Sequence, residues 1–202
     1  MRGIGINIVS FNAITEFEQA LGELTGAPFV VMTDCCTHAL ELCLRYEKVK
    51  RCRFSAFTYL SVPMSMHKLN ISYGLTADNE WVGEYQILGT RIWDSARLLR
   101  TGMYRAGQMQ CLSFGYSKPL DIGRGGAILL DDEVAYNKLI QQRSDGRDLR
   151  ITPWQDQKVF EVGYHYRPTI EEAVRALEKL PTIDQEPKYH VYPDLREIII
   201  KD

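Results

Sequence analysis

The sequence predicts an α/β fold in which a mostly parallel sheet is flanked by helices. Apolar, strand-like runs alternate with amphipathic, helix-like runs along most of the chain, and this alternation is typical of α/β domains. A length of 202 residues, 45% of them hydrophobic, suits one domain with a buried core. We expect that domain over residues 1–180, followed by an irregular extension, rich in charge and proline, over 181–202.

Helix signals mark three segments in the first third of the chain. Thr15 and Glu18 have the spacing of a capping box before a helix that ends near Gly26. Residues 37–48 place apolar side chains on one helical face. Residues 59–69 hold a proline in their first turn, where a helix tolerates it.

Two further helices are predicted in the second half. Asp131 is expected to cap a helix that ends before Gly146. Thr169 and Glu172 form a second capping box, and that helix ends before Pro181. Between the helices, short apolar runs predict strands at 29–32, 51–55, 70–75, 90–93, 109–114 and 127–130, with a further edge strand at 197–200.

Composition narrows the function classes. The formal net charge of −2 does not favour binding to nucleic acid or to a membrane surface, and no apolar run is long enough to span a bilayer. The start, residues 1–7, is too short and polar for a secretory signal. The five cysteines include no C-x-x-C pair, which favours reduced thiols in a cytoplasmic compartment. Cys35, Cys36 and His38 lack a second ligand pair, so we expect no metal.

The most informative motif is a serine followed five residues later by a lysine, Ser113 and Lys118, between two apolar runs. A lysine amine held between strands and kept neutral by burial can form a Schiff base with an aldehyde. The serine hydroxyl can hold an anion such as a cofactor phosphate. The alternative interpretation is a surface lysine beside Pro119 in a turn.

Two further segments follow predicted strands, where ligands of α/β sheets bind. The turn that contains Cys36 and Thr37 opens a helix, and helix N-termini bind anions; alternatively, Thr37 only caps the helix. Tyr59 follows Thr58 and can stack on a pyridine ring, unless it is an ordinary core or surface tyrosine.

The remaining two segments carry charge. Asp94 ends a strand, where a buried carboxylate can keep a pyridine nitrogen protonated; alternatively, it caps a helix. His165 and Arg167 precede the capped helix and can bind a phosphate or an anionic substrate, unless they belong to a polar loop.

In their order and spacing, these segments resemble the DegT/StrS-type sugar-nucleotide aminotransferases, which have the aspartate-aminotransferase fold (fold type I). The resemblance runs over residues 15–180 and is most specific at Lys118. It implies the large domain of a pyridoxal 5'-phosphate (PLP)-dependent transferase. It also implies transfer of an amino group from a small-molecule amino donor to a keto acceptor, such as a keto-sugar nucleotide. The matching stretches are Cys36-Thr37-His38-Ala39-Leu40, Thr58-Tyr59, Trp93-Asp94-Ser95-Ala96, Ser113 to Lys118 with Gly123 to Ala127, and Gly163 to Arg167.

The resemblance also implies a role for each residue. Lys118 would hold the cofactor as a Schiff base and Asp94 would pair with its pyridine nitrogen. Tyr59 would stack on the ring. His165 would reach the phosphate of the neighbouring subunit in a homodimer with a shared active site. The phosphate of the same chain's cofactor would be held by Cys36, Thr37 and Ser113.

The chain departs from the family pattern at four points. Arg97 stands near the cofactor's phenolic oxygen, where the family has Gln or His, and His165 replaces an Asn. The stretch between 75 and 90 is short, and little follows residue 180, so we expect the C-terminal small domain to be largely absent. These departures motivate an alternative, a non-catalytic relic that acts as a partner or structural subunit. A third reading, a different α/β enzyme, finds no G-x-G-x-x-G or P-loop in its support.

Overall fold

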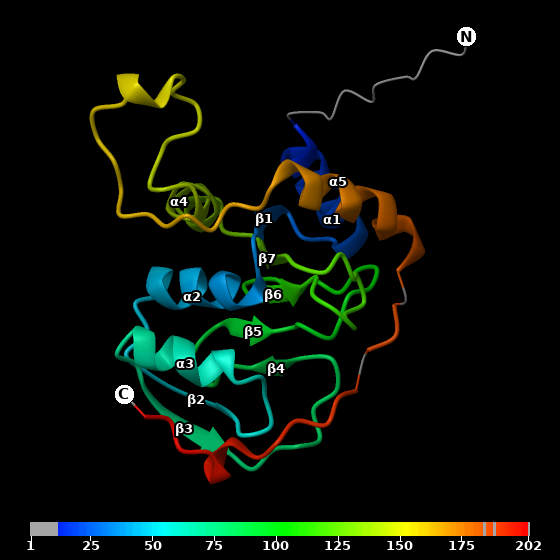
Figure 1. Ribbon diagram of the computed structural model, residues 1–202. Coiled ribbons are helices and arrows are strands. Elements are labelled where there is room, and N and C mark those ends of the chain that lie inside the picture. Colours follow the sequence, from blue (N-terminus) through cyan, green and yellow to red (C-terminus); the bar gives the residue numbers. More distant parts are fainter. Residues whose placement is uncertain (1–11, 184, 188, 202) are drawn as a thin grey trace.

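A computed structural model describes residues 12–183, 185–187 and 189–201 (Figure 1); residues 1–7, judged above not to be a secretory signal, lie outside this part. The centre of the molecule is a five-stranded sheet with the order β1–β7–β6–β5–β4. A separate parallel pair, β2 with β3, lies beside it. The strands are β1 (Phe29–Thr33), β2 (Arg51–Ser55), β3 (Ser72–Thr76), β4 (Tyr85–Gln86), β5 (Ile92–Asp94), β6 (Met109–Ser113) and β7 (Gly126–Leu130).

Helices cover both faces of this sheet (Figure 1). Among the described residues the helices are α1 (Ala13–Thr25), α2 (Cys36–Tyr46), α3 (Ser61–Lys68), α4 (Glu133–Arg143) and α5 (Ile170–Lys179), with single 3₁₀ turns at Trp154–Asp156, Leu180–Thr182 and Leu195–Glu197. None of these helices is long and apolar enough to cross a membrane.

Alternation of side chains along the strands produces two cores, one on each face of the sheet. In β1, Val31 points into the core formed with α2 and α4, whereas Val30 and Met32 point into the core formed with α1 and α5. In β7, Ile128 and Leu129 divide in the same way. Because both faces are covered, the strands read as continuous apolar runs, which explains why they were identifiable in the sequence.

The predicted α/β class with flanking helices is confirmed, but the sheet is mixed and not mostly parallel. Strands β1, β5 and β6 share one direction, while β7 runs antiparallel between β1 and β6, and β4 runs antiparallel at the edge. The cause lies in the connections: the chain turns back directly from β4 to β5 and from β6 to β7, which makes these pairs antiparallel, whereas residues 95–108 cross back before β6 and make β5 and β6 parallel.

Some local predictions were wrong in instructive ways. The Thr15–Glu18 capping box does not form, since Thr15 lies inside α1, and the Glu18 carboxylate instead accepts the Met32 backbone N–H at 2.8 Å. The cap of α4 is Asp132, one residue after the predicted Asp131. Residues 197–200 form no strand. By contrast, the Thr169–Glu172 capping box is present at the start of α5.

The C-terminal segment after α5 packs against the domain instead of leading away from it. In Figure 1 it passes beneath the sheet and ends near β3. Leu195 is buried, and its backbone N–H donates to the carbonyl of Ala56 at 3.0 Å. Residues that the sequence predicted as an irregular extension therefore take part in the structure around the central pocket.

Candidate active site

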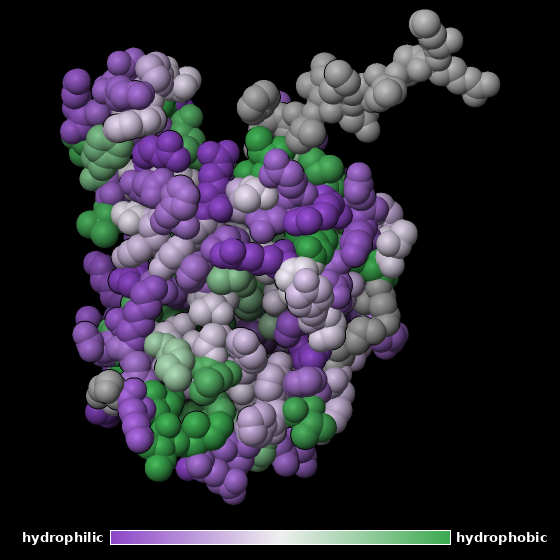
Figure 2. Space-filling model, viewed as in Figure 1, coloured by the Kyte–Doolittle hydropathy of each residue, from purple (hydrophilic) through white to green (hydrophobic). Residues whose placement is uncertain are grey.

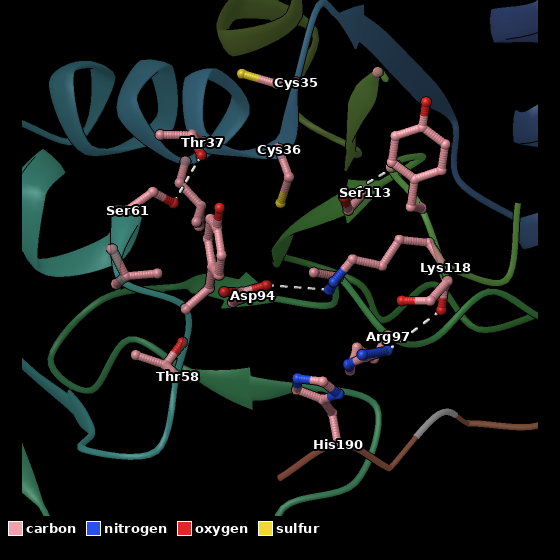
Figure 3. Close-up of a pocket in the computed structure, with 18 of the residues that line it drawn as sticks. Cys35, Cys36, Thr37, Thr58, Ser61, Asp94, Arg97, Ser113, Lys118 and His190 are labelled. Carbon is pink, nitrogen blue, oxygen red and sulfur yellow. Dashed lines mark hydrogen bonds between the residues drawn. The ribbon is translucent and has the colours of Figure 1, made fainter. Parts of the chain in front are cut away.

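One cavity of about 480 Å³ collects most of the residues that the sequence motifs single out. It lies where β1, β5 and β6 end, because these three strands share a direction and their carboxyl ends meet at one edge of the sheet. Figure 3 shows the side chains that converge there. Its lining includes Cys35, Cys36, Thr37, Thr58, Tyr59, Ser61, Trp81, Asp94, Arg97, Ser113, Lys118, Arg124, His190 and Tyr192.

The first wall of the cavity is the N-terminus of α2. Gly126 of β7 approaches it so closely that a Cβ atom there would lie 2.5 Å from the Cys36 backbone nitrogen, so only glycine fits. The Thr37 hydroxyl hydrogen-bonds the Ser61 hydroxyl at 2.8 Å (Figure 3). Burial raises the pKa of the Cys36 thiol well above its usual value, so Cys36 offers an anion its backbone N–H and not its side chain.

Asp94 forms a buried polar pair with Tyr85 at the end of β5. The Tyr85 hydroxyl donates to Asp94 Oδ2 at 2.9 Å and lies 2.6 Å from the Thr58 hydroxyl. The backbone N–H of Ala96 donates to Asp94 Oδ1 at 3.1 Å. Burial raises the pKa of Asp94, whereas the Tyr85 and Ala96 hydrogen bonds and the charge of Lys118 lower it. The carboxylate is therefore held in one orientation by three neighbours.

Lys118 extends across the cavity toward Asp94 (Figure 3). The preceding residue, Ser117, has a φ of 61°, a left-handed conformation that is uncommon outside glycine, and Asp121 fixes it by accepting its backbone N–H at 3.0 Å. Burial lowers the pKa of Lys118, and the charge of Arg97 lowers it further, against opposing effects of Cys36 and Asp94. The site thus shifts Lys118 toward its neutral, nucleophilic form.

Arg97 and the C-terminal segment form the opposite wall. Arg97 is only 5% exposed, and its Nη1 donates to the Ser117 carbonyl at 3.3 Å. Its guanidinium carbon lies 6.0 Å from the centre of the Tyr192 ring. His190 lines the same wall. This wall contains two residues from a segment that sequence reasoning had left outside the site.

Tyr59 and Ser113 also line the cavity, as predicted. Tyr59 is 64% exposed, so its ring is free to pack on a ligand. The Ser113 hydroxyl lies 3.5 Å from the backbone nitrogen of Gly115, at the end of β6. Of the eight predicted site residues, seven are therefore brought to one cavity.

His165 is the predicted site residue that does not line the cavity. Its imidazole Nδ1 lies 3.2 Å from both carboxylate oxygens of Asp145, and its side chain is 88% exposed. Within one chain, His165 is not among the residues that line the cavity. That His165 reaches the cofactor phosphate of a neighbouring subunit therefore stays a prediction.

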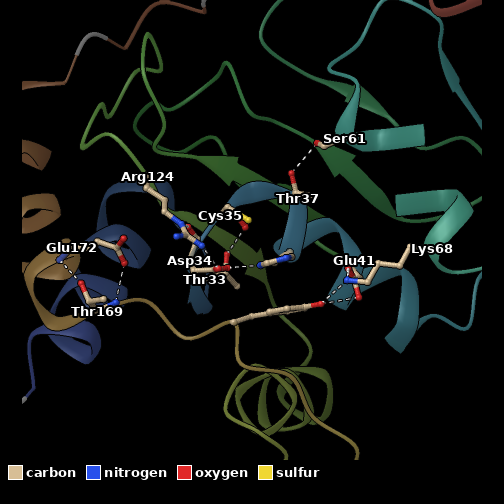
Figure 4. A network of polar contacts seen from close by, with 12 residues as sticks. Thr33, Asp34, Cys35, Thr37, Glu41, Ser61, Lys68, Arg124, Thr169 and Glu172 are labelled. Atoms are coloured by element: carbon tan, nitrogen blue, oxygen red, sulfur yellow. Dashed lines mark hydrogen bonds and ion pairs between the residues drawn. The ribbon is translucent and has the colours of Figure 1, made fainter. Parts of the chain in front are cut away.

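A polar network joins the turn before α2 to α3 and to the 163–167 segment (Figure 4). Asp34 accepts from Arg124 Nη2 at 2.6 Å and lies 2.7 Å from His38 Nδ1. The His38 ring stacks on Tyr166 with centroids 3.6 Å apart. Burial lowers the pKa of His38, but hydrogen bonds to Asp34 and Cys35 outweigh it and raise this pKa to about 9. The network braces the helix N-terminus.

The same turn places donors of Asp34, Cys35 and His38 within 4.8 Å of one another. Arg124 and a protonated His38 already satisfy the Asp34 carboxylate. Cys36, which the sequence places beside them, instead points its thiol at the Cys111 carbonyl, 3.7 Å away. The cluster is accounted for by its own ion pairs.

Sequence reasoning missed four residues that line the cavity, Trp81, Arg124, His190 and Tyr192. It also missed Tyr85, which does not line the cavity but donates to Asp94. Tyr85 lies in the two-residue strand β4, too short to show a periodicity. Arg124 lies within the glycine-rich turn, which did carry a signal. His190 and Tyr192 carry none, because their contribution depends on where the C-terminal segment packs.

Comparison with known proteins gives two results. Residues 100–189 match the family model of the DegT/DnrJ/EryC1/StrS aminotransferases, so the resemblance inferred from the motifs is confirmed there. A search of curated protein sequences finds no match.

Solved structures share the fold. The crystal structure of 3-amino-5-hydroxybenzoic acid (AHBA) synthase has a TM-score of 0.70 at 18% identity, covering 87% of this chain and 57% of that one. AtS13 from Actinomadura melliaura has a TM-score of 0.70 at 20% identity, covering 85% and 60%. PseC of Helicobacter pylori, an aminotransferase involved in pseudoaminic acid biosynthesis, has 0.67 at 15%, covering 84% and 57%. The chain thus spans less than two thirds of each, and the likeness confirms the fold type.

Proposed function

We propose that this chain is a PLP-dependent aminotransferase that moves an amino group from a small amino donor to a keto acceptor, such as a keto-sugar nucleotide. The observation that carries the proposal is the pair of Lys118 and Asp94 in one cavity, with a helix N-terminus beside them. The family match over residues 100–189 includes Lys118 and supports it. The structural likeness to PseC, an aminotransferase, supports the same general activity.

The residues of the cavity fit pyridoxal phosphate. The backbone N–H groups at the start of α2 and the hydroxyls of Thr37 and Ser113 would donate hydrogen bonds to the phosphate. The buried carboxylate of Asp94 would pair with the pyridine nitrogen, and the exposed ring of Tyr59 would stack on the pyridine ring. The volume of about 480 Å³ leaves room for a substrate beside the cofactor.

Bound pyridoxal phosphate would supply an electron sink for bond breaking at the amino-bearing carbon. The protein supplies the rest. Lys118, whose pKa is lowered by burial, would provide the amine that holds the cofactor and would carry a proton between carbon atoms. Asp94 keeps a positive charge at the ring nitrogen, and its bond from Tyr85 fixes the carboxylate plane. Tyr59 and Trp81 would place aromatic rings beside the bound cofactor, since both line the cavity.

We also propose a homodimer in which His165 of one chain completes the site of the other. An arm over residues 147–163 projects from the domain beside α4 (Figure 1), and Figure 2 shows apolar surface on it. Its exposed apolar side chains are Leu149, Ile151, Trp154, Val159, Phe160 and Val162. A cluster of this kind is typical of a surface that is covered by a partner. His165 follows this arm directly in the chain, and its side chain is 88% exposed.

The test is a visible absorption spectrum of the purified protein with pyridoxal phosphate, before and after borohydride treatment, with mass analysis of the Lys118 peptide. A yellow protein that yields a reduced cofactor adduct on Lys118 is the expected result. A protein that takes up no cofactor would favour the alternative, a non-catalytic relic that serves as a partner or structural subunit. The burial of Asp94 and the pKa of Lys118 argue against that alternative, because neither arrangement serves packing alone.

A further inference from the structure

Cys35 differs in its surroundings from the other cysteines of the chain, all five of which lie in the part that the structure describes. Its side chain is half-buried, whereas the other four are buried: Cys36, Cys43, Cys52 and Cys111. Burial raises the pKa of Cys52 to about 11 and the pKa values of Cys36 and Cys111 well above their usual range. Because a thiol reacts as its thiolate and only where reagents reach it, cysteine chemistry in this fold belongs to Cys35.

The first turn of α2 places an imidazole and a carboxylate beside this thiol. His38 follows Cys35 by three residues and Asp34 by four, so that the three side chains share one side of the turn. The Cys35 sulfur, a carboxylate oxygen of Asp34 and a ring nitrogen of His38 all lie within 4.8 Å of one another. His38 Nδ1 is 2.7 Å from Asp34 Oδ1. A nucleophile, an imidazole and a carboxylate that orients the imidazole are the parts of an activated cysteine site.

The charges around Cys35 favour an anion at the sulfur. The single carboxylate of Asp34 faces two cations, since Arg124 Nη2 lies 2.6 Å from its Oδ2 and His38, with a pKa of about 9, is protonated at pH 7. The turn therefore carries an excess of positive charge. Cys35 is also the N-cap residue of α2, where the free backbone N–H groups of a helix add partial positive charge. A thiolate at Cys35 would balance this excess.

The Cys35 thiol lies on a side of the helix that the chemistry of Lys118 does not use. In Figure 3 the thiol of Cys36 points toward Lys118, whereas that of Cys35 points the opposite way. Figure 4 shows Arg124 reaching Asp34 next to Cys35. The Arg124 side chain is 61% exposed, so a molecule that approaches this turn from solvent meets a guanidinium. Small reagents that carry negative charge are therefore favoured.

We propose that Cys35, His38 and Asp34 form a nucleophilic thiol site that exchanges with small anionic disulfides. The Cys35 thiolate attacks one sulfur of the disulfide; a new S–S bond forms as the old one breaks, and the other half leaves as a thiolate. Cys35 is thereby oxidised and the released half is reduced. The thiol proton passes to solvent, because His38 already carries its own.

The resulting mixed disulfide has no second thiol of the chain placed to resolve it. Cys36, the neighbour in the sequence, points its thiol at the Cys111 carbonyl, 3.7 Å away. The adduct should therefore persist until an external thiol reverses it. It would lie at the rim of the cavity, since Cys35 and Arg124 are both among the lining residues. The reaction needs neither Lys118 nor a cofactor, so it does not depend on the proposed function.

The experiment follows the reaction of the full chain at pH 7 with 5,5'-dithiobis(2-nitrobenzoate), a dianionic disulfide, and with the neutral 4,4'-dithiodipyridine. Peptide mass analysis locates each adduct, and each rate is divided by that of N-acetylcysteine methyl ester with the same reagent. We expect the adduct on Cys35 alone. The relative rate should be about 3- to 10-fold higher for the dianion at low salt, and this preference should disappear at high salt.

Two histidine variants test the activation. His38→Gln removes the imidazolium and should slow the reaction of Cys35 by about tenfold. His67→Gln, which alters a histidine of α3 next to Tyr73, is the matched control and should leave the rate unchanged. Circular dichroism establishes that each variant is folded.

Three outcomes overturn the inference. The first is no adduct on Cys35 in the folded, unaltered chain under conditions in which the unfolded chain is modified at all five cysteines; this result does not require any variant to fold. The second is an equal relative rate for the dianionic and neutral reagents at low salt. The third is an unchanged rate in folded His38→Gln. Failure of the proposed function is a separate result, namely no borohydride-reduced adduct on Lys118, and it leaves the reaction at Cys35 measurable.

Discussion

The 113–118 and 163–167 segments both carry motif residues in the sequence, yet Lys118 and His165 have opposite surroundings in the fold. Lys118 enters a cavity among buried polar groups, where burial and Arg97 lower its pKa. His165 lies on the outside, with an 88% exposed side chain and one acidic neighbour, Asp145. The fold of one chain thus brings Lys118 into the cavity, whereas the role of His165 stays a prediction that needs a second chain.

The difference has a physical basis. Lys118 follows β6, and a strand end in an α/β sheet has a fixed position relative to neighbouring strand ends. His165 follows the 147–163 arm, which no strand anchors. Within the same segment Tyr166 is tied to the domain, since its carbonyl accepts the Asp34 backbone N–H at 2.9 Å and its ring stacks on His38. The His165 side chain itself points to the outside, where its imidazole contacts Asp145.

The largest expected effect is at Lys118, inside the cavity. Lys118→Ala should remove the cofactor adduct and lower turnover by at least about 10⁴-fold, because it deletes both the attachment point and the proton carrier. Lys50→Ala, which removes an exposed lysine at the edge of the domain, is the matched control and should leave both unchanged. Persistence of turnover in Lys118→Ala would remove the assigned mechanism.

The second prediction tests whether His165 of one chain completes the cavity that holds Lys118 of another chain. His165→Ala should lower activity, and an equimolar mixture of Lys118→Ala and His165→Ala chains should regain about a quarter of the wild-type activity, because half of the dimers then carry one intact site. Each variant alone is the control. A mixture no more active than His165→Ala diluted twofold would show that the two residues do not act in one shared site.

The third prediction concerns the support of Asp94. Tyr85→Phe removes a hydrogen bond that lowers the pKa of this buried carboxyl, so the pKa should rise and the carboxylate should be lost at a higher pH. Because a carboxyl group is charged only above its pKa, activity should fall first at the acid end of the profile, by about tenfold there, and little at alkaline pH. Tyr73→Phe, distant from the cavity, should leave the pH profile unchanged. A uniform loss at every pH would indicate a packing defect instead.

The sequence predicts the residues that directly follow strands better than those whose position depends on loops, on the C-terminal segment or on a second chain. Four of the five strands of the sheet and the seven cavity residues were identifiable, since buried strands are apolar runs and motif residues follow them; the two-residue strand β4 was not. The direction of β7 was not, because it depends on the short connection after β6. His190 and Tyr192 carried no signal, since they reach the cavity only through packing around Leu195. Whether His165 meets a cofactor depends on a second chain.

The smallest expected effect compares two threonines that look alike in the sequence. Thr169 caps α5, accepting the Glu172 backbone N–H at 3.2 Å while the Glu172 carboxylate accepts the Thr169 N–H at 2.8 Å. Thr15 has the same spacing to Glu18 but lies exposed inside α1. Thr169→Ala should therefore lower the free energy of unfolding by about 1 kcal/mol, or about 2–4 °C in thermal midpoint for a chain of this size.

Thr15→Ala should be neutral or slightly stabilising, because alanine has the higher helix propensity. Differential scanning calorimetry of both variants distinguishes the two sites. Equal losses would mean that Thr15 also caps a helix. Helix α5 follows the 163–167 segment and packs on α1. A loss confined to Thr169→Ala would therefore show that this capping box stabilises the helix that anchors the end of this segment to the core.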